Sequence, residues 1–110
     1  MTESRWRTAP ARLEELIEEG IIDCHDNDEA HSGMATMLEE NVVCPFQAQV
    51  MGELVTVTSL EWRPRGYGMN AVCVRGGREH RVNLDSLEWV EPLPEGFEWI
   101  EAYLDFCEGL

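Results

Sequence analysis

The stretch CPFQAQVMGELVTVTS, residues 44–59, decides the fold, because here the spacing of apolar residues changes from helical to alternating. Phe46, Ala48 and Val50 alternate with polar residues. Gly52 and Glu53 are then expected to turn the chain into the β-branched run of residues 55–58. The stretch therefore predicts a β-hairpin.

Three further strands are expected after this hairpin. Residues 69–75 and 78–84 should pair across Gly76 and Gly77, because glycine takes positive φ without steric cost. Residues 86–90 should add a fifth strand, which Pro92 would end. Five short strands predict a small antiparallel sheet that curls toward an SH3-like barrel.

Helical spacing precedes the strands. An apolar stripe at three- and four-residue steps predicts a helix that begins after Pro10, and the stripe consists of Leu13, Leu16, Ile17 and Ile21. A second helix is expected to start at Asp28, whose carboxylate would cap the first turn, and to continue to about Asn41. Gly33 costs such a helix about 1 kcal/mol relative to alanine, so either the helix kinks there or a neighbour packs close against it.

Helical spacing returns after the strands. One apolar stripe is expected to pack on the sheet, and it consists of Phe97, Ile100, Tyr103, Leu104 and Cys107. Glu98, Glu101 and Asp105 would form the opposite, exposed face, where solvent and salt can screen their mutual repulsion. We therefore expect an α+β fold with two N-terminal helices, the sheet and a C-terminal helix. Residues 1–110 should form one domain, with a flexible segment at residues 1–10.

The charge of the chain limits its partners. There are 22 acidic residues and eight basic ones, all arginine, and the net charge is −14. Such a chain repels nucleic acid and anionic membranes, so divalent cations or a basic protein are the expected partners. Four cysteines without close pairs, no apolar leader and no transmembrane stretch predict a cytoplasmic protein.

The most acidic segment, IIDCHDNDEAHSG at residues 21–33, can be interpreted in three ways. Calcium prefers six to eight oxygen ligands, and the candidates are Asp23, Asp26, Asp28 and Glu29, with Glu39 and Glu40 at the far end of the second helix. Cys24, His25 and His31 would instead suit Zn²⁺, although their spacing matches no zinc template. The third interpretation is an acidic helix-capping loop with no ligand.

Known motifs exclude some functions. The segment lacks the oxygen alternation and closing glutamate of an EF-hand. No P-loop, nucleotide fingerprint, GxSxG or HExxH motif is present. We therefore expect no enzymatic activity.

Several segments in this order resemble the small cyanobacterial calcium-binding protein family (CcbP-like). They are LEELIEEGIIDC, DEAHSGMATMLEENVVCPFQAQV, GELVTVTSL, VNLDSLEWV and EWIEAYLDF, between residues 13 and 106. The resemblance implies an acidic calcium binder without an EF-hand, in which Asp23, Glu29 and the pair Glu39 and Glu40 hold the ion. Asp26 and Asp28 are added on chemical grounds alone. The expected function is Ca²⁺ buffering or sensing; the alternative is an acidic protein-interaction module whose faces at residues 14–19 and 98–105 dock a basic partner.

Overall fold

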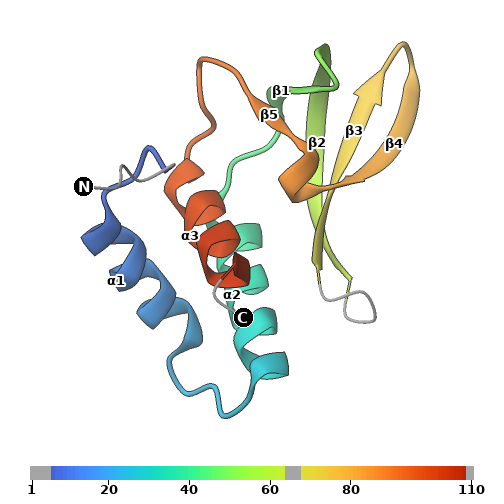
Figure 1. Cartoon of the computed structure of the whole chain (residues 1–110). Helices are drawn as coiled ribbons and strands as arrows, with labels where there is room; N and C mark the ends of the chain where they lie inside the picture. The colour runs from blue at the N-terminus through green and yellow to red at the C-terminus, as the bar shows by residue number, and fades with distance from the viewer. Residues whose placement is uncertain (1–5, 64–67, 109–110) are drawn as a thin grey trace.

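The computed structural model describes residues 6–63 and 68–108, which form three α-helices and a five-stranded antiparallel sheet (Figure 1). The elements in chain order are α1 (Pro10–Ile21), α2 (Asn27–Asn41), β1 (Phe46–Val50), β2 (Glu53–Arg63), β3 (Gly68–Arg75), β4 (Arg78–Asn83), the 3₁₀ helix η1 (Leu84–Ser86), β5 (Glu88–Trp89) and α3 (Phe97–Glu108). The predicted α+β class is confirmed. Of the helices in the described residues, none has the length and apolar character needed to span a membrane.

Two tight hairpins form the centre of the sheet. β1 and β2 join through Met51 and Gly52, with φ angles of 51° and 79°. β3 and β4 join through Gly76 and Gly77, with φ angles of 58° and 76°. Positive φ at both central positions gives a turn whose twist matches the flanking strands. The second hairpin is confirmed, whereas the first turn lies one residue earlier than predicted, because Glu53 already pairs with Val50.

The sheet curls without closing. Its strand order is β4-β3-β2-β1-β5, and the two-residue β5 pairs with β1. A register shift between Val57 and Ser59 interrupts the pairing of β2 with β3, and such bulges increase local twist. Within the described residues β4 and β5 do not pair with each other, so closure into an SH3-like barrel is not confirmed.

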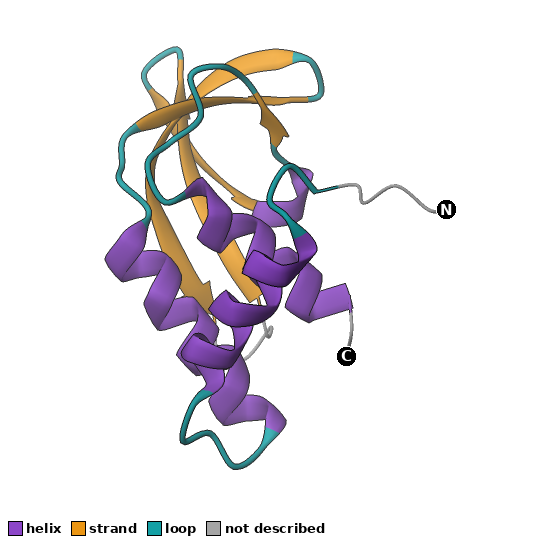
Figure 2. Ribbon diagram, turned by 90° about the vertical axis from the view of Figure 1, so that its left-hand side faces the viewer, coloured by secondary structure: helices purple, strands orange, loops and turns teal. Residues whose placement is uncertain are grey.

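The helices form a layer beside the sheet (Figures 1 and 2). α2 lies next to β2, and α1 packs on α2 and α3. Alternating strand residues and the apolar stripes of the helices bury each other, because this removes apolar surface from water. The core residues that are at most 1% exposed include Leu16, Met34, Leu38, Val57, Met69 and Ile100.

A pair of glycines lets α1 and α2 approach closely. A Cβ atom on Gly33 would collide with the backbone carbonyl oxygen of Gly20, and one on Gly20 would collide with Sδ of Met34. Of the two explanations predicted for a glycine inside α2, the close neighbour is confirmed. The helix accepts the cost of glycine because two backbones meet there.

Glu101 of α3 is buried, contrary to the prediction that it lies on an exposed face. Its side chain is only 4% exposed. The carboxylate accepts hydrogen bonds from the backbone N–H groups of Arg7 and Thr8, at 2.9 and 2.7 Å, and from Thr8 Oγ1 at 2.7 Å. The chain before α1 therefore packs on this face and excludes water from it.

The neighbouring acids of α3 also bind the N-terminal part of the chain. Trp6 Nε1 donates to Asp105 Oδ1 at 3.2 Å, and Arg12 forms an ion pair with Glu98 at 3.1 Å. These contacts relieve the repulsion among acids spaced three and four residues apart on one helix. Of the segment expected to be flexible, residues 1–5 lie outside the described residues.

Candidate cation site at the junction of the first two helices

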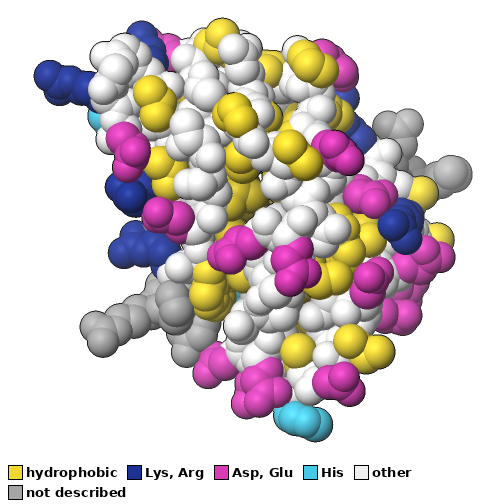
Figure 3. Space-filling model, turned by 180° about the vertical axis from the view of Figure 1, so that it is seen from behind, with side chains coloured by type: hydrophobic (Ala, Val, Ile, Leu, Met, Phe, Trp, Pro, Cys, Tyr) yellow, Lys and Arg dark blue, Asp and Glu magenta, His cyan; other side chains and the backbone are white. Residues whose placement is uncertain are grey.

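The turn between α1 and α2 is short and places several oxygen atoms at one end of the molecule. The backbone N–H of Cys24 donates to the carbonyl oxygen of Ile21 at 3.0 Å. Asp23 follows the end of α1 with a φ angle of 66°, a left-handed conformation that aspartate tolerates better than most residues. Figure 3 shows acidic side chains and one histidine gathered at this end.

Two of the predicted ligands cap α2. Asp26 is the N-cap, and its Oδ1 accepts the backbone N–H of Glu29 at 2.8 Å. Glu29 reaches back, and its Oε2 accepts the backbone N–H of His25 at 2.8 Å. This reciprocal pair resembles a capping box and satisfies otherwise unpaired donors at the start of the helix. The prediction that Asp28 caps α2 is wrong, because the N-cap is Asp26, two residues earlier, and Asp28 lies in the first turn of the helix.

The carboxylates of the turn surround a cysteine. Burial, and then the negative charges of Glu29, Asp23 and Asp26, raise the pKa of the Cys24 thiol above its usual range. The thiol donates to the carbonyl oxygen of Glu29 at 3.3 Å. These carboxylates therefore lie close enough together to act on one group, and Cys24 is a thiol rather than a thiolate at neutral pH.

Asp23 and Asp28 remain uncommitted. Neither side chain makes a hydrogen bond or an ion pair with the rest of residues 6–63 and 68–108, and both are exposed. Asp26 and Glu29 each use one carboxylate oxygen in the cap and keep the other. Nevertheless, no three side chains of His, Cys, Asp or Glu in the described part of the chain form a preassembled metal-binding group.

The softer donors of the zinc interpretation are not brought together. His31 is 6% exposed and stacks on Trp62 at a centroid distance of 5.8 Å, with Tyr103 and Phe106 in edge contact. Burial lowers the pKa of the His31 imidazole, and the charge of Asp28 partly opposes that change. His31 thus belongs to the aromatic core, and this role follows from its helical spacing with Met34 and Leu38.

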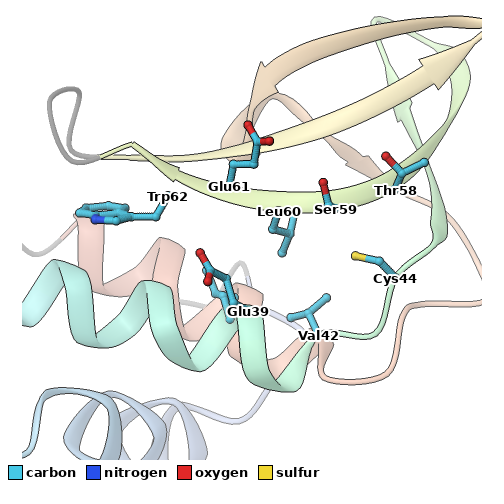
Figure 4. Close-up of a pocket in the computed structure, with 9 residues that line it drawn as sticks. Glu39, Val42, Cys44, Thr58, Ser59, Leu60, Glu61 and Trp62 are labelled. Carbon is cyan, nitrogen blue, oxygen red and sulfur yellow. The ribbon is translucent and has the colours of Figure 1, made fainter.

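The remaining predicted ligands, Glu39 and Glu40, lie at the other end of α2. Ten residues of helix separate Glu29 from Glu39, which corresponds to about 15 Å. Both glutamates are exposed. Glu39 lines a cleft of about 550 Å³ between α2 and β2 (Figure 4). The six predicted residues therefore form two groups, four at the junction and two at the far end of α2.

The cleft also contains residues that sequence reasoning did not place in any site. Ser59 and Glu61 of β2 line it together with Cys44, whose thiol pKa is raised by burial. The β-branched run expected from the sequence ended at residue 58, whereas β2 continues to Arg63. The sequence did not indicate that residues 59 and 61 would lie near α2, because that contact is long-range.

These features define a small α+β protein in which a three-helix layer packs beside an open antiparallel sheet and an acidic turn joins the first two helices. The fold is similar to that in the crystal structure of Anabaena CcbP, with a TM-score of 0.75 and 16% sequence identity, over 96% of this chain and 95% of that one. It is also similar to a calcium-binding protein solved in its calcium-binding form, with a TM-score of 0.72 and 18% identity, over 98% and 97% of the two chains. No protein-family model and no curated protein sequence matches this chain. The resemblance noted in the sequence is thus confirmed at the level of the fold.

Proposed function

We propose that this protein binds Ca²⁺ without an EF-hand. The observation that carries the proposal is the likeness of the whole chain to two solved structures, one of a protein described as calcium-binding and in its calcium-binding form. The net charge of −14 supports it, because the field of the protein attracts divalent cations. A binding role, rather than catalysis, is accordingly the function we assign.

The junction of α1 and α2 is the proposed site. Asp23 and Asp28 supply uncommitted carboxylates, and Asp26 and Glu29 supply one oxygen each beyond those used in the cap. Calcium accepts such mixtures of carboxylates, backbone carbonyls and water. Because no preassembled group exists among the described residues, the ion itself would draw these oxygens together and offset their repulsion. Glu39 and Glu40 are the proposed ligands of a second, separate site.

The chemistry of the junction favours Ca²⁺ over Zn²⁺. Zinc binds thiolate and neutral imidazole, but burial, and then the nearby carboxylates, raise the pKa of the Cys24 thiol, and His31 lies in the core. The donors that remain at the junction are mainly hard oxygen atoms. The protein should therefore retain calcium in the presence of an equal concentration of zinc.

Buffering and sensing differ in whether the ion changes the structure. Asp26 and Glu29 hold the first turn of α2 as well as offering oxygens, so an ion at the junction would be coupled to the start of that helix. We favour sensing on this ground. A calcium-dependent shift of the backbone amide resonances of α2 beyond residue 30 would support sensing, whereas shifts confined to residues 23–30 would indicate a buffer.

Isothermal titration calorimetry tests the proposed site. Chelator-treated protein should bind Ca²⁺ with a defined stoichiometry and bind Mg²⁺ more weakly. The double variant Asp23→Asn and Asp28→Asn should weaken calcium binding at least tenfold, because two of the charged ligands are lost while both capping residues remain. A matched control, Glu14→Gln with Glu18→Gln, removes the same charge from exposed residues of α1 and should leave binding nearly unchanged. Equal losses of calcium affinity in the two double variants would show that binding depends only on the net charge of the protein and would refute the site.

An acidic protein-interaction module remains the second candidate. Glu14, Glu18 and Glu19 are exposed on α1 and form no ion pair with the described residues, which favours a basic partner on that helix. The proposed face at residues 98–105 is less available, since the N-terminal segment covers Glu101. In the calorimetric experiment this candidate predicts weak uptake of Ca²⁺ and Mg²⁺ alike, without a stoichiometric endpoint.

A further inference from the structure

The second half of β2 has an edge without a strand partner. β1 pairs with β2 only along Glu53–Val57, whereas β3 pairs with its other side as far as Arg63. On the side away from β3, residues 58–63 make no backbone hydrogen bond to another element in the part of the chain that the structure describes. Alternate N–H and C=O groups on such an edge can accept a further strand.

This edge borders the cleft between α2 and β2, which we call the α2–β2 cleft. It has a volume of about 550 Å³, which lies within the usual range for ligand-binding sites. Leu38, Glu39 and Val42 of α2 form one wall, Cys44 lies at one end, and residues 58–62 of β2 form the other wall. The cleft therefore runs along the free edge itself (Figure 4).

Glutamates lie on both sides of β2 beside the cleft. Figure 4 shows Glu39 projecting from α2 toward β2, and Glu61 projecting from the opposite side of the strand. Glu39 has no ion pair within the described residues, whereas Glu61 binds Arg81 Nε at 2.9 Å. Leu38 is fully buried, so the apolar surface next to Glu39 comes from half-buried Leu60 and from the 8% of Val42 that remains exposed.

A strand added to this edge would direct alternate side chains to the two sides of the sheet. Those facing α2 would meet Glu39 and the apolar surface of Leu60 and Val42. Those on the other side would lie beside Ser59 and Glu61. Arginine or lysine next to Glu39, alternating with small or apolar residues, is the sequence that this geometry fits.

We propose that the α2–β2 cleft binds an extended, arginine- or lysine-bearing peptide segment of another protein by β-strand addition to residues 58–62. A second copy of this chain fits poorly, because its charge is also −14 and pairing of like edges would oppose glutamates to glutamates. The bulge between Val57 and Ser59 lies where β1 pairing stops, and bulges are frequent beside binding sites. This proposal does not depend on calcium binding at the junction of α1 and α2.

Fluorescence anisotropy with a labelled nonapeptide tests the proposal. The probe alternates valine and arginine and is blocked at both ends; one comparison peptide carries glutamate in place of arginine, and another is N-methylated at alternate amides so that one edge cannot pair. The arginine peptide should bind the full chain, and the other two should bind at least tenfold more weakly. Measuring in chelator and again in calcium separates this result from that of the metal titration.

Variants of the chain locate the peptide. Glu39→Gln should weaken binding of the arginine peptide about threefold to fivefold, the range of an exposed ion pair. Glu18→Gln, which removes an exposed acid of α1 outside the cleft lining, should not. Amide hydrogen exchange of residues 58–62 should slow when the peptide is bound. Equal binding of the N-methylated peptide, equal losses in the two variants, or a dimer that the peptide does not dissociate would each overturn the proposal.

Discussion

The acidic residues of α3 and those of the α1–α2 junction look alike in sequence but are used differently in the structure. On α3, Glu98, Glu101 and Asp105 each bind the N-terminal part of the same chain. At the junction, Asp23 and Asp28 bind nothing among the described residues. In the first region acidity maintains the fold, and in the second it is available for a ligand.

The difference teaches that local acidity alone does not mark a binding site. An acid whose oxygens already accept hydrogen bonds from its own chain contributes to stability, and its removal leaves donors unpaired. An acidic side chain without such contacts adds only electrostatic repulsion to the folded state. Its removal in the absence of ligand should therefore change the free energy of unfolding very little. Asp26 and Glu29 fall between these cases, because each has one oxygen in the helix cap.

The largest effect is expected at Glu101. Glu101→Ala leaves two backbone N–H groups and the Thr8 hydroxyl without their acceptor. The donors are only part-buried, so each should cost near the lower end of the about 1–3 kcal/mol of an unpaired buried group. The free energy of unfolding should therefore fall by about 3 kcal/mol in urea denaturation. Glu98→Ala, the matched acid three residues earlier, should cause a much smaller loss. Similar losses of stability in both variants would show that the buried Glu101 contributes no more to the fold than the more exposed Glu98.

The next effect concerns the glycine contact that holds the two helices of the junction together. Gly33→Ala improves helix propensity by about 1 kcal/mol, but its Cβ collides with the carbonyl oxygen of Gly20. Overpacking of this kind costs about 1–3 kcal/mol, so we expect a net loss of stability of about 1–2 kcal/mol. Ser32→Ala, at the neighbouring exposed position, should be neutral or stabilising. If Gly33→Ala were as stable as Ser32→Ala, the close contact would not exist in solution.

A third prediction uses pH. Burial lowers the pKa of His31 below its ordinary value of 6.5. Below pH 6.5 the unfolded chain takes up a proton that the folded chain does not, so stability is complete above that pH and declines as the pH falls toward the folded pKa. The slope from this one group is at most about 1.4 kcal/mol per pH unit. Urea denaturation between pH 7.5 and 5.5 should show the decline, and His31→Phe, which keeps an aromatic ring beside Trp62, should flatten it. An unchanged slope in that variant would assign the pH dependence to the carboxylates.

The elements could be predicted from the sequence because their signals are local. Gly76 and Gly77 fix a hairpin by backbone freedom, and the alternation from Phe46 to Val50 fixes a strand by side-chain period. The α2 cap was misplaced by two residues, because Asp26 and Asp28 are chemically equivalent caps and only the folded turn distinguishes them. Errors of this kind shift the boundary of an element by only a few residues along the chain.

Long-range contacts could not be predicted in the same way. Glu98 and Glu101 have the same chemistry, and only the packing of Thr8 on α3 buries one of them. The same limit applies to the candidate site. Sequence identified the acids of the junction, but whether their oxygens are free depends on the turn geometry, and the cleft beside Glu39 depends on where β1 stops pairing with β2.

The smallest effects should separate capping acids from uncommitted acids within the junction itself. Asp26→Ala removes the acceptor for the backbone N–H of Glu29 and should cost about 1 kcal/mol, as N-cap losses do. Asp28→Asn should cost only a few tenths, the contribution of a charge near the helix N-terminus. Asp23→Asn should cost almost nothing, because asparagine also accepts the left-handed conformation at this position. Urea denaturation in chelator measures all three. In saturating calcium the gap between the native chain and Asp23→Asn should widen, since a ligand that binds only the folded state stabilises it by an amount that grows with the logarithm of its affinity. A gap that stays the same would mean that Asp23 does not contact the ion, and the junction would then be a helix cap and nothing more.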